Sequence, residues 1–156
     1  MKMIVRVSTR LACTEEELWR KLSQPASLRF VAAPILRFVP VREGDLDGAW
    51  KVDVPYEMKL SLLSFVPLGR HTIRLVRIDD EANTVVSRES GALARVWSHT
   101  ISFHEVAPGV VRYTDEIEIR AGWLTPAVWL FAHLFYRHRQ RRWKVLLRGD
   151  GRGRRA

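Results

Sequence analysis

The stretch "VWSHTISFHEVAPGVVRYTDEIEIRAG", residues 96–122, alternates apolar and polar side chains in the way that is typical of two neighbouring strands. Successive side chains of a strand point to opposite faces of its sheet. One face of the first strand carries Trp97, His99, Ile101 and Phe103. The matching face of the second strand carries Val111, Tyr113, Asp115, Ile117 and Ile119. We therefore predict an antiparallel hairpin with one mainly apolar face and one polar face.

The turn at residues 107–109 sets the register of this hairpin. A three-residue loop places Trp97 opposite Ile119 and Ile101 opposite Asp115, whereas a slip of one residue would mix the two faces. In this register His99 and Asp115 are diagonal neighbours on the apolar face. The hairpin is therefore expected to bring an imidazole and a carboxylate together in the interior.

The chain upstream of the hairpin changes its hydrophobic period twice. Residues 3–11 alternate like a half-buried strand. Thr14 and Glu17 then form the signature of a capping box, and Pro25 ends the short helix that follows. A second short helix is predicted before Pro34, and short apolar runs separated by turn residues fill residues 35–121. We expect an α+β fold in which two short helices follow the first strand of a six- or seven-stranded antiparallel sheet.

A long helix is predicted after the sheet, with Thr125 as N-cap, Pro126 at the first helical position and Gly149 as the C-terminal stop. The sheet-facing arc at helical spacing consists of Val128, Trp129, Ala132, Tyr136, Arg139, Trp143, Leu146 and Leu147. Most basic side chains of the helix lie on the opposite side, and Arg139 is the exception. A buried guanidinium needs a carboxylate, so we expect Arg139 to pair with Asp115, with Glu89 as the reserve partner.

The positive charge of the chain is concentrated at its C-terminal end. Residues 135–156 hold nine Lys and Arg side chains against one acid, whereas residues 1–134 hold 17 against 16. The formal net charge of +9 is therefore a local feature, and a nearly neutral body argues against a dedicated nucleic-acid domain. We expect one domain over residues 1–148, followed by a flexible basic tail over residues 149–156.

Several classes of protein are disfavoured by the remaining features of the sequence. The single cysteine, Cys13, cannot form an internal disulfide, and the N-terminus has no apolar segment of the signal-peptide kind, so we expect a cytoplasmic protein. The most apolar stretch, residues 123–136, is too short to span a bilayer. No His, Cys and carboxylate cluster has ligand spacing, so neither a metal nor another cofactor is expected.

This order of elements resembles the START-like or SRPBCC superfamily, including bacterial members labelled polyketide cyclase or dehydrase-like. The resemblance is strongest in "TEEELWRKLSQPASLRFV" (14–31), in "VWSHTISF" (96–103) with "VRYTDEIEIRAG" (111–122), and in "LTPAVWLFAHLFYRHRQRRW" (124–143). It implies a helix-grip fold, in which a curved sheet wraps around the long C-terminal helix. It also implies a cavity between them that takes an apolar or amphipathic, lipid-like or polyketide-like molecule.

The side chains that face this cavity in the predicted arrangement are the candidate ligand-binding residues. They are Trp97, His99, Ile101, Phe103, Tyr113, Asp115, Ile117, Trp129, Ala132, Tyr136 and Arg139. His99, Tyr113, Asp115 and Arg139 could also form a catalytic acid/base set, or a polar network that only anchors the helix to the sheet.

Three functions follow from these features: binding of a hydrophobic small molecule, an enzyme of the cyclase, dehydratase or hydrolase type in the same cavity, and attachment of the basic C-terminus to anionic lipid or nucleic acid. Leu130 and Leu134 lie away from the sheet-facing arc. They mark a homodimer contact, a region covered by residues 61–69, or a weak membrane contact.

Overall fold

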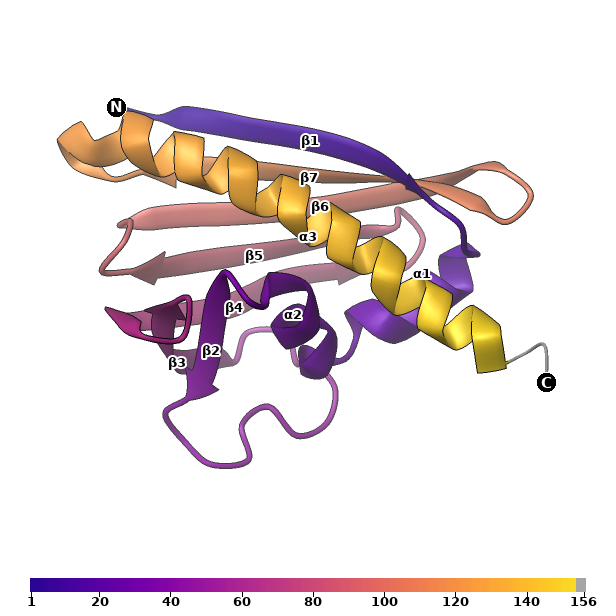
Figure 1. Ribbon diagram of the computed structural model, residues 1–156, viewed down its shortest axis with the longest axis horizontal. Helices are drawn as coiled ribbons and strands as arrows, with labels where there is room; N and C mark the ends of the chain where they lie inside the picture. The colour runs from indigo at the N-terminus through magenta and orange to yellow at the C-terminus, as the bar shows by residue number, and fades with distance from the viewer. Residues whose placement is uncertain (154–156) are drawn as a thin grey trace.

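The computed structural model describes the backbone of residues 1–153 and the side chains of residues 1–149. Its elements in chain order are β1 (Met3–Leu11), α1 (Glu15–Leu22), α2 (Pro25–Ala32), β2 (Leu36–Pro40), β3 (Pro55–Leu62), β4 (Val66–Asp79), β5 (Thr84–Gly91), β6 (Val96–Ala107), β7 (Val110–Arg120), the 3₁₀ helix η1 (Gly122–Leu124) and α3 (Thr125–Gly153). The seven strands form one antiparallel sheet in the order β1-β7-β6-β5-β4-β3-β2, and α3 crosses one face of it (Figure 1). The predicted α+β helix-grip arrangement is confirmed.

The hairpin of β6 and β7 has the predicted register. Trp97 lies opposite Ile119, and Ile101 lies opposite Asp115. The turn is one residue shorter than expected because Ala107 still pairs with Val110 after an irregularity at the end of β6. Gly109 has a φ of 72°, a conformation that glycine adopts without steric cost. The irregularity absorbs one residue, so the apolar faces of the two strands still coincide.

The two short helices form where the sequence predicts them and pack beside α3. The Thr14 hydroxyl accepts a hydrogen bond from the Glu17 amide, and Pro25 is the first residue of α2. His138 of α3 lies 2.8 Å from the Ala33 carbonyl oxygen through Nε2. The Arg142 guanidinium lies 3.9 Å from the centre of the Phe30 ring. These contacts hold α2 against α3 on the same side of the sheet (Figure 1).

The buried face of α3 follows the predicted helical phase. Of the predicted arc, Trp129 and Leu146 are half-buried, and the buried members are Val128, Ala132, Tyr136, Arg139, Trp143 and Leu147. Phe135 and Gln140, which are not members of the predicted arc, are also buried. Leu130 and Leu134 are exposed, as their position outside the arc predicts.

The predicted C-terminal stop at Gly149 is wrong. The helix begins at Thr125 and continues to Gly153. A glycine weakens a helix by about 1 kcal/mol but ends it only when the chain leaves the helical conformation there, and Gly149 does not take a positive φ. Residues 154–156 of the predicted tail lie outside the described residues, and the domain boundary at residue 148 stays a prediction.

Two apolar clusters pack between the sheet and the helices. The first joins strands from both edges of the sheet to the N-terminal half of α3, and includes Val5, Phe38, Met58 and Ile117. The second joins β1, β6, β7, α1 and α2 to the C-terminal half of α3, and includes Leu11, Leu18, Phe103 and Trp143. The candidate site is built from polar side chains that are buried in this same interior: His71, Ser87, His99, Asp115, Arg139 and Gln140.

Candidate functional site: a polar cluster in an apolar cavity

A cavity of about 90 Å³ lies between the sheet and the helices. Much of its lining is apolar: Phe38, Leu60 and Ile73 come from strands β2 to β4, and Phe135 comes from α3. Polar side chains also contribute to the wall, notably His71, Ser87, Glu89, His99 and Arg139. The cavity can therefore contact an apolar molecule over most of its surface and a polar group along part of it.

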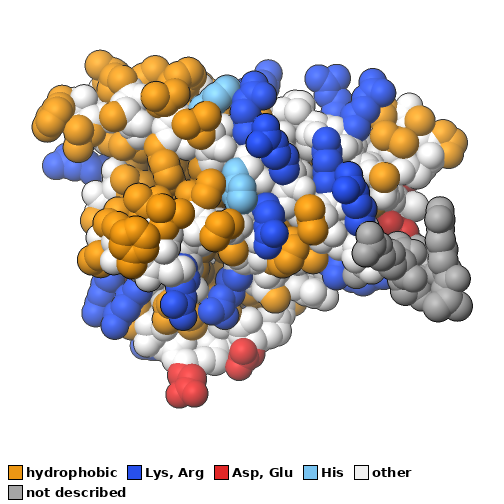
Figure 2. All heavy atoms as spheres, viewed as in Figure 1, with side chains coloured by type: hydrophobic (Ala, Val, Ile, Leu, Met, Phe, Trp, Pro, Cys, Tyr) orange, Lys and Arg blue, Asp and Glu red, His pale blue; other side chains and the backbone are white. Residues whose placement is uncertain are grey.

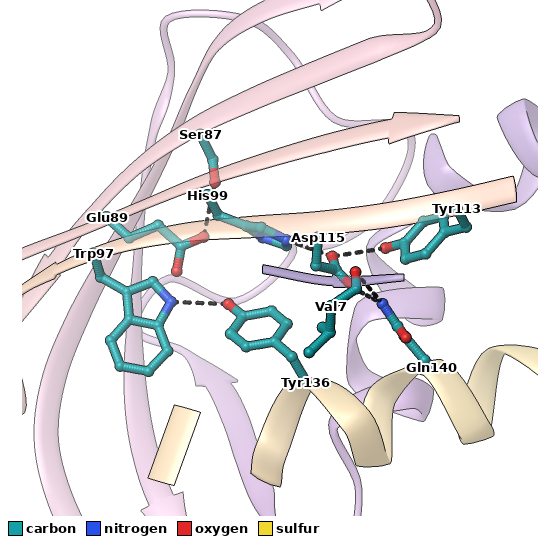
Figure 3. Close-up of polar contacts among 9 residues, drawn as sticks. All are labelled: Val7, Ser87, Glu89, Trp97, His99, Tyr113, Asp115, Tyr136 and Gln140. Carbon is teal, nitrogen blue, oxygen red and sulfur yellow. Dashed lines mark hydrogen bonds and ion pairs between the residues drawn. The ribbon is translucent and has the colours of Figure 1, made fainter. Parts of the chain in front are cut away.

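Asp115 is the centre of the polar cluster beside this cavity and has no exposed surface (Figure 3). Its Oδ1 lies 2.6 Å from His99 Nε2 and 3.0 Å from the Tyr113 hydroxyl. Gln140 Nε2 donates to Oδ2 at 3.0 Å and also to the Val7 carbonyl oxygen at 2.8 Å. Burial raises the pKa of Asp115, but the hydrogen bond and charge of His99, the charge of Arg139 and the hydrogen bond from Gln140 together outweigh it, so the pKa lies below its usual value. The ionised carboxylate thus joins β6, β7 and α3.

A second carboxylate, Glu89 on β5, also has hydrogen-bond partners at both of its oxygens. His71 Nε2 lies 2.8 Å from its Oε2, and the Ser87 hydroxyl donates to its Oε1 at 2.8 Å. Burial raises the pKa of Glu89, but the hydrogen bond and charge of His71 lower it further, so its pKa also lies below the usual value. Both carboxylates of the cavity region are therefore ionised at neutral pH and each contacts an imidazole.

Arg139 faces the interior as predicted, with only 5% of its surface exposed, but it does not pair with Asp115. Among the described residues, no carboxylate oxygen lies within 4.0 Å of its guanidinium, and its buried Nε has no hydrogen-bond partner. The reason is competition. Both oxygens of Asp115 are taken by other donors, including Gln140, the residue next to Arg139. The guanidinium lies instead 5.0 Å from the centre of the Tyr136 ring.

The structure divides the predicted ligand-binding residues into two groups. Five of them line the cavity: Trp97, His99, Ile101, Tyr136 and Arg139. The other six do not: Phe103 and Tyr113 belong to the second apolar cluster, Ile117 and Ala132 to the first, Asp115 contacts His99, and the Trp129 indole N–H donates to the Ile4 carbonyl oxygen. The role of any of them in binding stays a prediction.

Sequence reasoning missed three polar members of the site, although two of them left a signal. His71, Ile73 and Leu75 alternate with more exposed residues along β4, which is the period of a half-buried strand. Gln140 lies four residues after Tyr136, so both lie on one side of a helix. Ser87 carried no comparable signal, because a small hydroxyl side chain fits either face of a strand.

The chemistry available to the cavity centres on His99. Its Nε2 contacts Asp115, and its ring lines the cavity. An imidazole oriented by a carboxylate is the arrangement of a general base. Cys13 is a poor nucleophile, because burial, with Glu17 and Glu105 nearby, raises the pKa of its thiol to about 11. Within residues 1–149, no three His, Cys, Asp or Glu side chains are placed to hold a metal ion.

A curved antiparallel sheet and a long C-terminal helix define the helix-grip class of α+β proteins, and this chain has that fold. Protein CV1439 from Chromobacterium violaceum is similar to it with a TM-score of 0.72 and 13% identity, over 92% of this chain and 95% of that one. TTHA0849 from Thermus thermophilus has a TM-score of 0.66 at 10% identity, over 91% and 94%. Ara h 8.0201 has a TM-score of 0.68 at 10% identity, over 96% and 99%. Likeness at such low identity establishes the fold and not the activity.

The chain belongs to the family described as a domain of unknown function (DUF8410), whose model matches residues 9–146. None of the curated proteins matches the sequence significantly. None of the helices in the described residues is both long and apolar enough to cross a membrane. The helix-grip fold agrees with what the sequence resemblance to the START-like superfamily implies, and membership of that superfamily stays a prediction.

Proposed function

We propose that this protein binds a small apolar or amphipathic molecule in the cavity between the sheet and the helices. The observation that carries the proposal is the composition of the wall, which is largely apolar but includes Arg139 and His71, whose buried Nε and Nδ1 atoms have no hydrogen-bond partner. Such a wall suits a ligand with an apolar body and one polar end. The cavity is smaller than the roughly 300–1,000 Å³ that is common for drug-sized ligands. We therefore expect a compact ligand, or one that displaces side chains on entry.

Filling the cavity is expected to abolish binding. Leu60 is buried and lines the cavity, so the indole of Leu60→Trp would occupy the space for a ligand. We expect 2-phenylethanol, a compact neutral probe, to bind the wild-type protein in ligand-observed NMR and to bind Leu60→Trp at least about tenfold more weakly. The matched control is Leu134→Trp, because Leu134 is 60% exposed on α3. Native mass spectrometry of the purified wild-type protein would show whether a molecule is retained.

Two results would contradict this proposal. One is equal binding of the probe to both tryptophan variants. The other is a wild-type protein that retains no molecule and does not bind the probe, combined with a rise in melting temperature in Leu60→Trp. That combination would mean that the cavity is a packing defect that a larger side chain repairs.

An enzyme that uses the same cavity is the alternative favoured by the contact between His99 and Asp115. His99 could remove a proton from a bound molecule at Nδ1 while Asp115 stabilises the imidazolium that forms. The alternative requires that the bound molecule be converted. Binding that survives in His99→Gln, together with conversion that is lost in that variant, would favour the enzyme over the binding module.

Peripheral attachment to an anionic lipid surface is a second candidate function, favoured by the exposed stripe of α3. The stripe is apolar at Leu130 and Leu134, which are 54% and 60% exposed. It becomes basic further along, at Arg137, Arg141, Lys144 and Arg148, all exposed. Figure 2 shows Lys and Arg side chains along α3 beside hydrophobic side chains. Apolar and basic side chains on one helix face suit a membrane interface, and the apolar part favours lipid over nucleic acid.

Vesicle sedimentation tests this second function. We expect binding to phosphatidylcholine vesicles that contain phosphatidylserine, weaker binding to pure phosphatidylcholine, and a loss on raising the salt concentration. The double variant Arg137→Gln/Arg141→Gln should bind about thirtyfold more weakly, since each cation near an anionic surface contributes about 1 kcal/mol. The charge-matched control is Arg74→Gln/Arg88→Gln. Arg88 lies on the sheet face opposite to Ser87 and Glu89, and Arg74 is its cross-strand neighbour on β4. Equal loss in both double variants would contradict a docking face on α3.

A further inference from the structure

The guanidinium of Arg139 makes no direct ion pair with a described carboxylate, although Asp115 and Glu89 lie in the same interior. Arginine stays protonated at every pH at which proteins are folded, so this buried group is a cation. Its exposed fraction is 5%, its Nε has no hydrogen-bond partner, and no described carboxylate oxygen lies within 4.0 Å of it. The Tyr136 ring, 5.0 Å from the guanidinium carbon, offers only a weak cation–π contact. Burial of a charge without a direct partner is costly, so a ligand in the cavity could provide the acceptor that the guanidinium lacks.

The two nearby carboxylates are not free to turn toward Arg139. Asp115 is held by His99, Tyr113 and Gln140, and Gln140 is itself fixed to β1 through the Val7 carbonyl oxygen. Glu89 is held through both oxygens by His71 and Ser87 (Figure 3 shows the bond from Ser87). Reorientation of either side chain would break hydrogen bonds in a buried site, where each lost partner costs about 1–3 kcal/mol.

We propose that the ligand of the cavity is a monocarboxylate with a compact apolar body, whose carboxylate binds the guanidinium of Arg139. The planar guanidinium presents paired N–H donors that match the two oxygens of a carboxylate. Asp115 and Glu89 are ionised in the same interior, so each further negative charge on a ligand is disfavoured and a dianion such as a phosphate monoester fits less well than a monocarboxylate. The apolar wall, with Phe38, Leu60 and Ile73, would hold the body. This inference rests on the proposed function of the cavity.

Three probes that share one body and differ at the head group test the inference: phenylacetate, phenylacetamide and 2-phenylethanol. With wild-type protein, we expect calorimetry or ligand-observed NMR to show phenylacetate binding about tenfold or more tightly than the amide, because a charged hydrogen bond contributes more than a neutral one. Arg139→Met should remove this preference and leave the amide affinity within about threefold. Arg139→Lys should keep part of it, since the charge remains without the planar pair of donors.

The matched control is Arg141→Met, which removes an exposed arginine two residues further along α3 and should keep the full preference for phenylacetate. Circular dichroism shows whether each variant is folded. The ¹H–¹⁵N signal of the Arg139 side chain, assigned by its absence in Arg139→Lys, reports ligand contact in the wild-type protein. This measurement does not depend on the stability of any variant. Phenylacetate should shift this signal in the wild-type protein, and phenylacetamide should leave it nearly in place.

Different failures have different meanings. Two results would overturn the inference that Arg139 binds a carboxylate, while the proposed binding function of the cavity would remain. One is equal affinity of the wild-type protein for phenylacetate and phenylacetamide. The other is a preference for phenylacetate that persists in Arg139→Met. Absence of binding by all three probes, with no molecule retained by the purified protein, would overturn the proposed function of the cavity and this inference with it.

Discussion

Asp115→Ala is expected to lower the free energy of unfolding by about 3–5 kcal/mol, the usual cost of removing one partner from a buried charged network. The substitution leaves His99, Tyr113 and Gln140 without their common acceptor. It also removes a carboxylate that has no exposed surface and that joins β6, β7 and α3. Urea denaturation at pH 7, followed by circular dichroism, measures the change.

The control for this prediction is the next residue in the chain. Glu116 points to the other face of β7, where it pairs with Arg6 at 2.6 Å, and its side chain is 41% exposed. Exposed ion pairs contribute about 1 kcal/mol or less, so Glu116→Ala should have a small effect. A loss of stability in Asp115→Ala as small as the one expected for Glu116→Ala would show that the Asp115 network does not hold the sheet to α3.

Trp143→Ala is expected to lower the free energy of unfolding by about 3–5 kcal/mol as well, because it opens a large void in a packed region. Trp143 is 1% exposed in the second apolar cluster, and its ring centre lies 6.0 Å from that of Tyr113. Its indole N–H has no hydrogen-bond partner, so Trp143→Phe, which keeps an aromatic ring and removes that N–H, should cost clearly less than Trp143→Ala. The same urea titration compares the two variants.

Val145→Ala tests the helix phase on which this second prediction depends. Val145 lies two residues after Trp143 on α3 and is 48% exposed, so its truncation should change stability by about 0.5 kcal/mol or less. A loss at Val145 as large as the loss at Trp143 would mean that α3 presents a different face to the sheet.

The hairpin of β6 and β7 could be predicted in detail because both strands alternate over their full length. With Asp115 and His99 on the apolar face, only one register keeps the two apolar faces together, and the structure has that register. The inward direction of Arg139 followed equally from the helical period. These features depend on spacing within a single element, which a sequence displays directly.

The partner of Asp115 could not be predicted in the same way. The sequence places Arg139 and Gln140 on the inner side of α3 but does not say how far the helix slides or rolls over the sheet. A shift of one residue decides whether the guanidinium or the amide meets the carboxylate, and here the amide does. Strands β2 to β5 raised a similar difficulty, because register irregularities between Lys59 and Ser61 and between Leu75 and Arg77 interrupt their alternation.

The strand order also has a consequence for synthesis of the chain on the ribosome. The first strand, β1, has β7 as its neighbour in the sheet, with Met3 opposite Ile119. The N-terminal strand therefore emerges first and waits for its partner until nearly the whole sheet has been translated. Long-range pairing of this kind slows folding and leaves unpaired strand edges exposed in the meantime. A nascent chain that stalls before β7 would keep the apolar side chains of β1 uncovered and open to capture by chaperones.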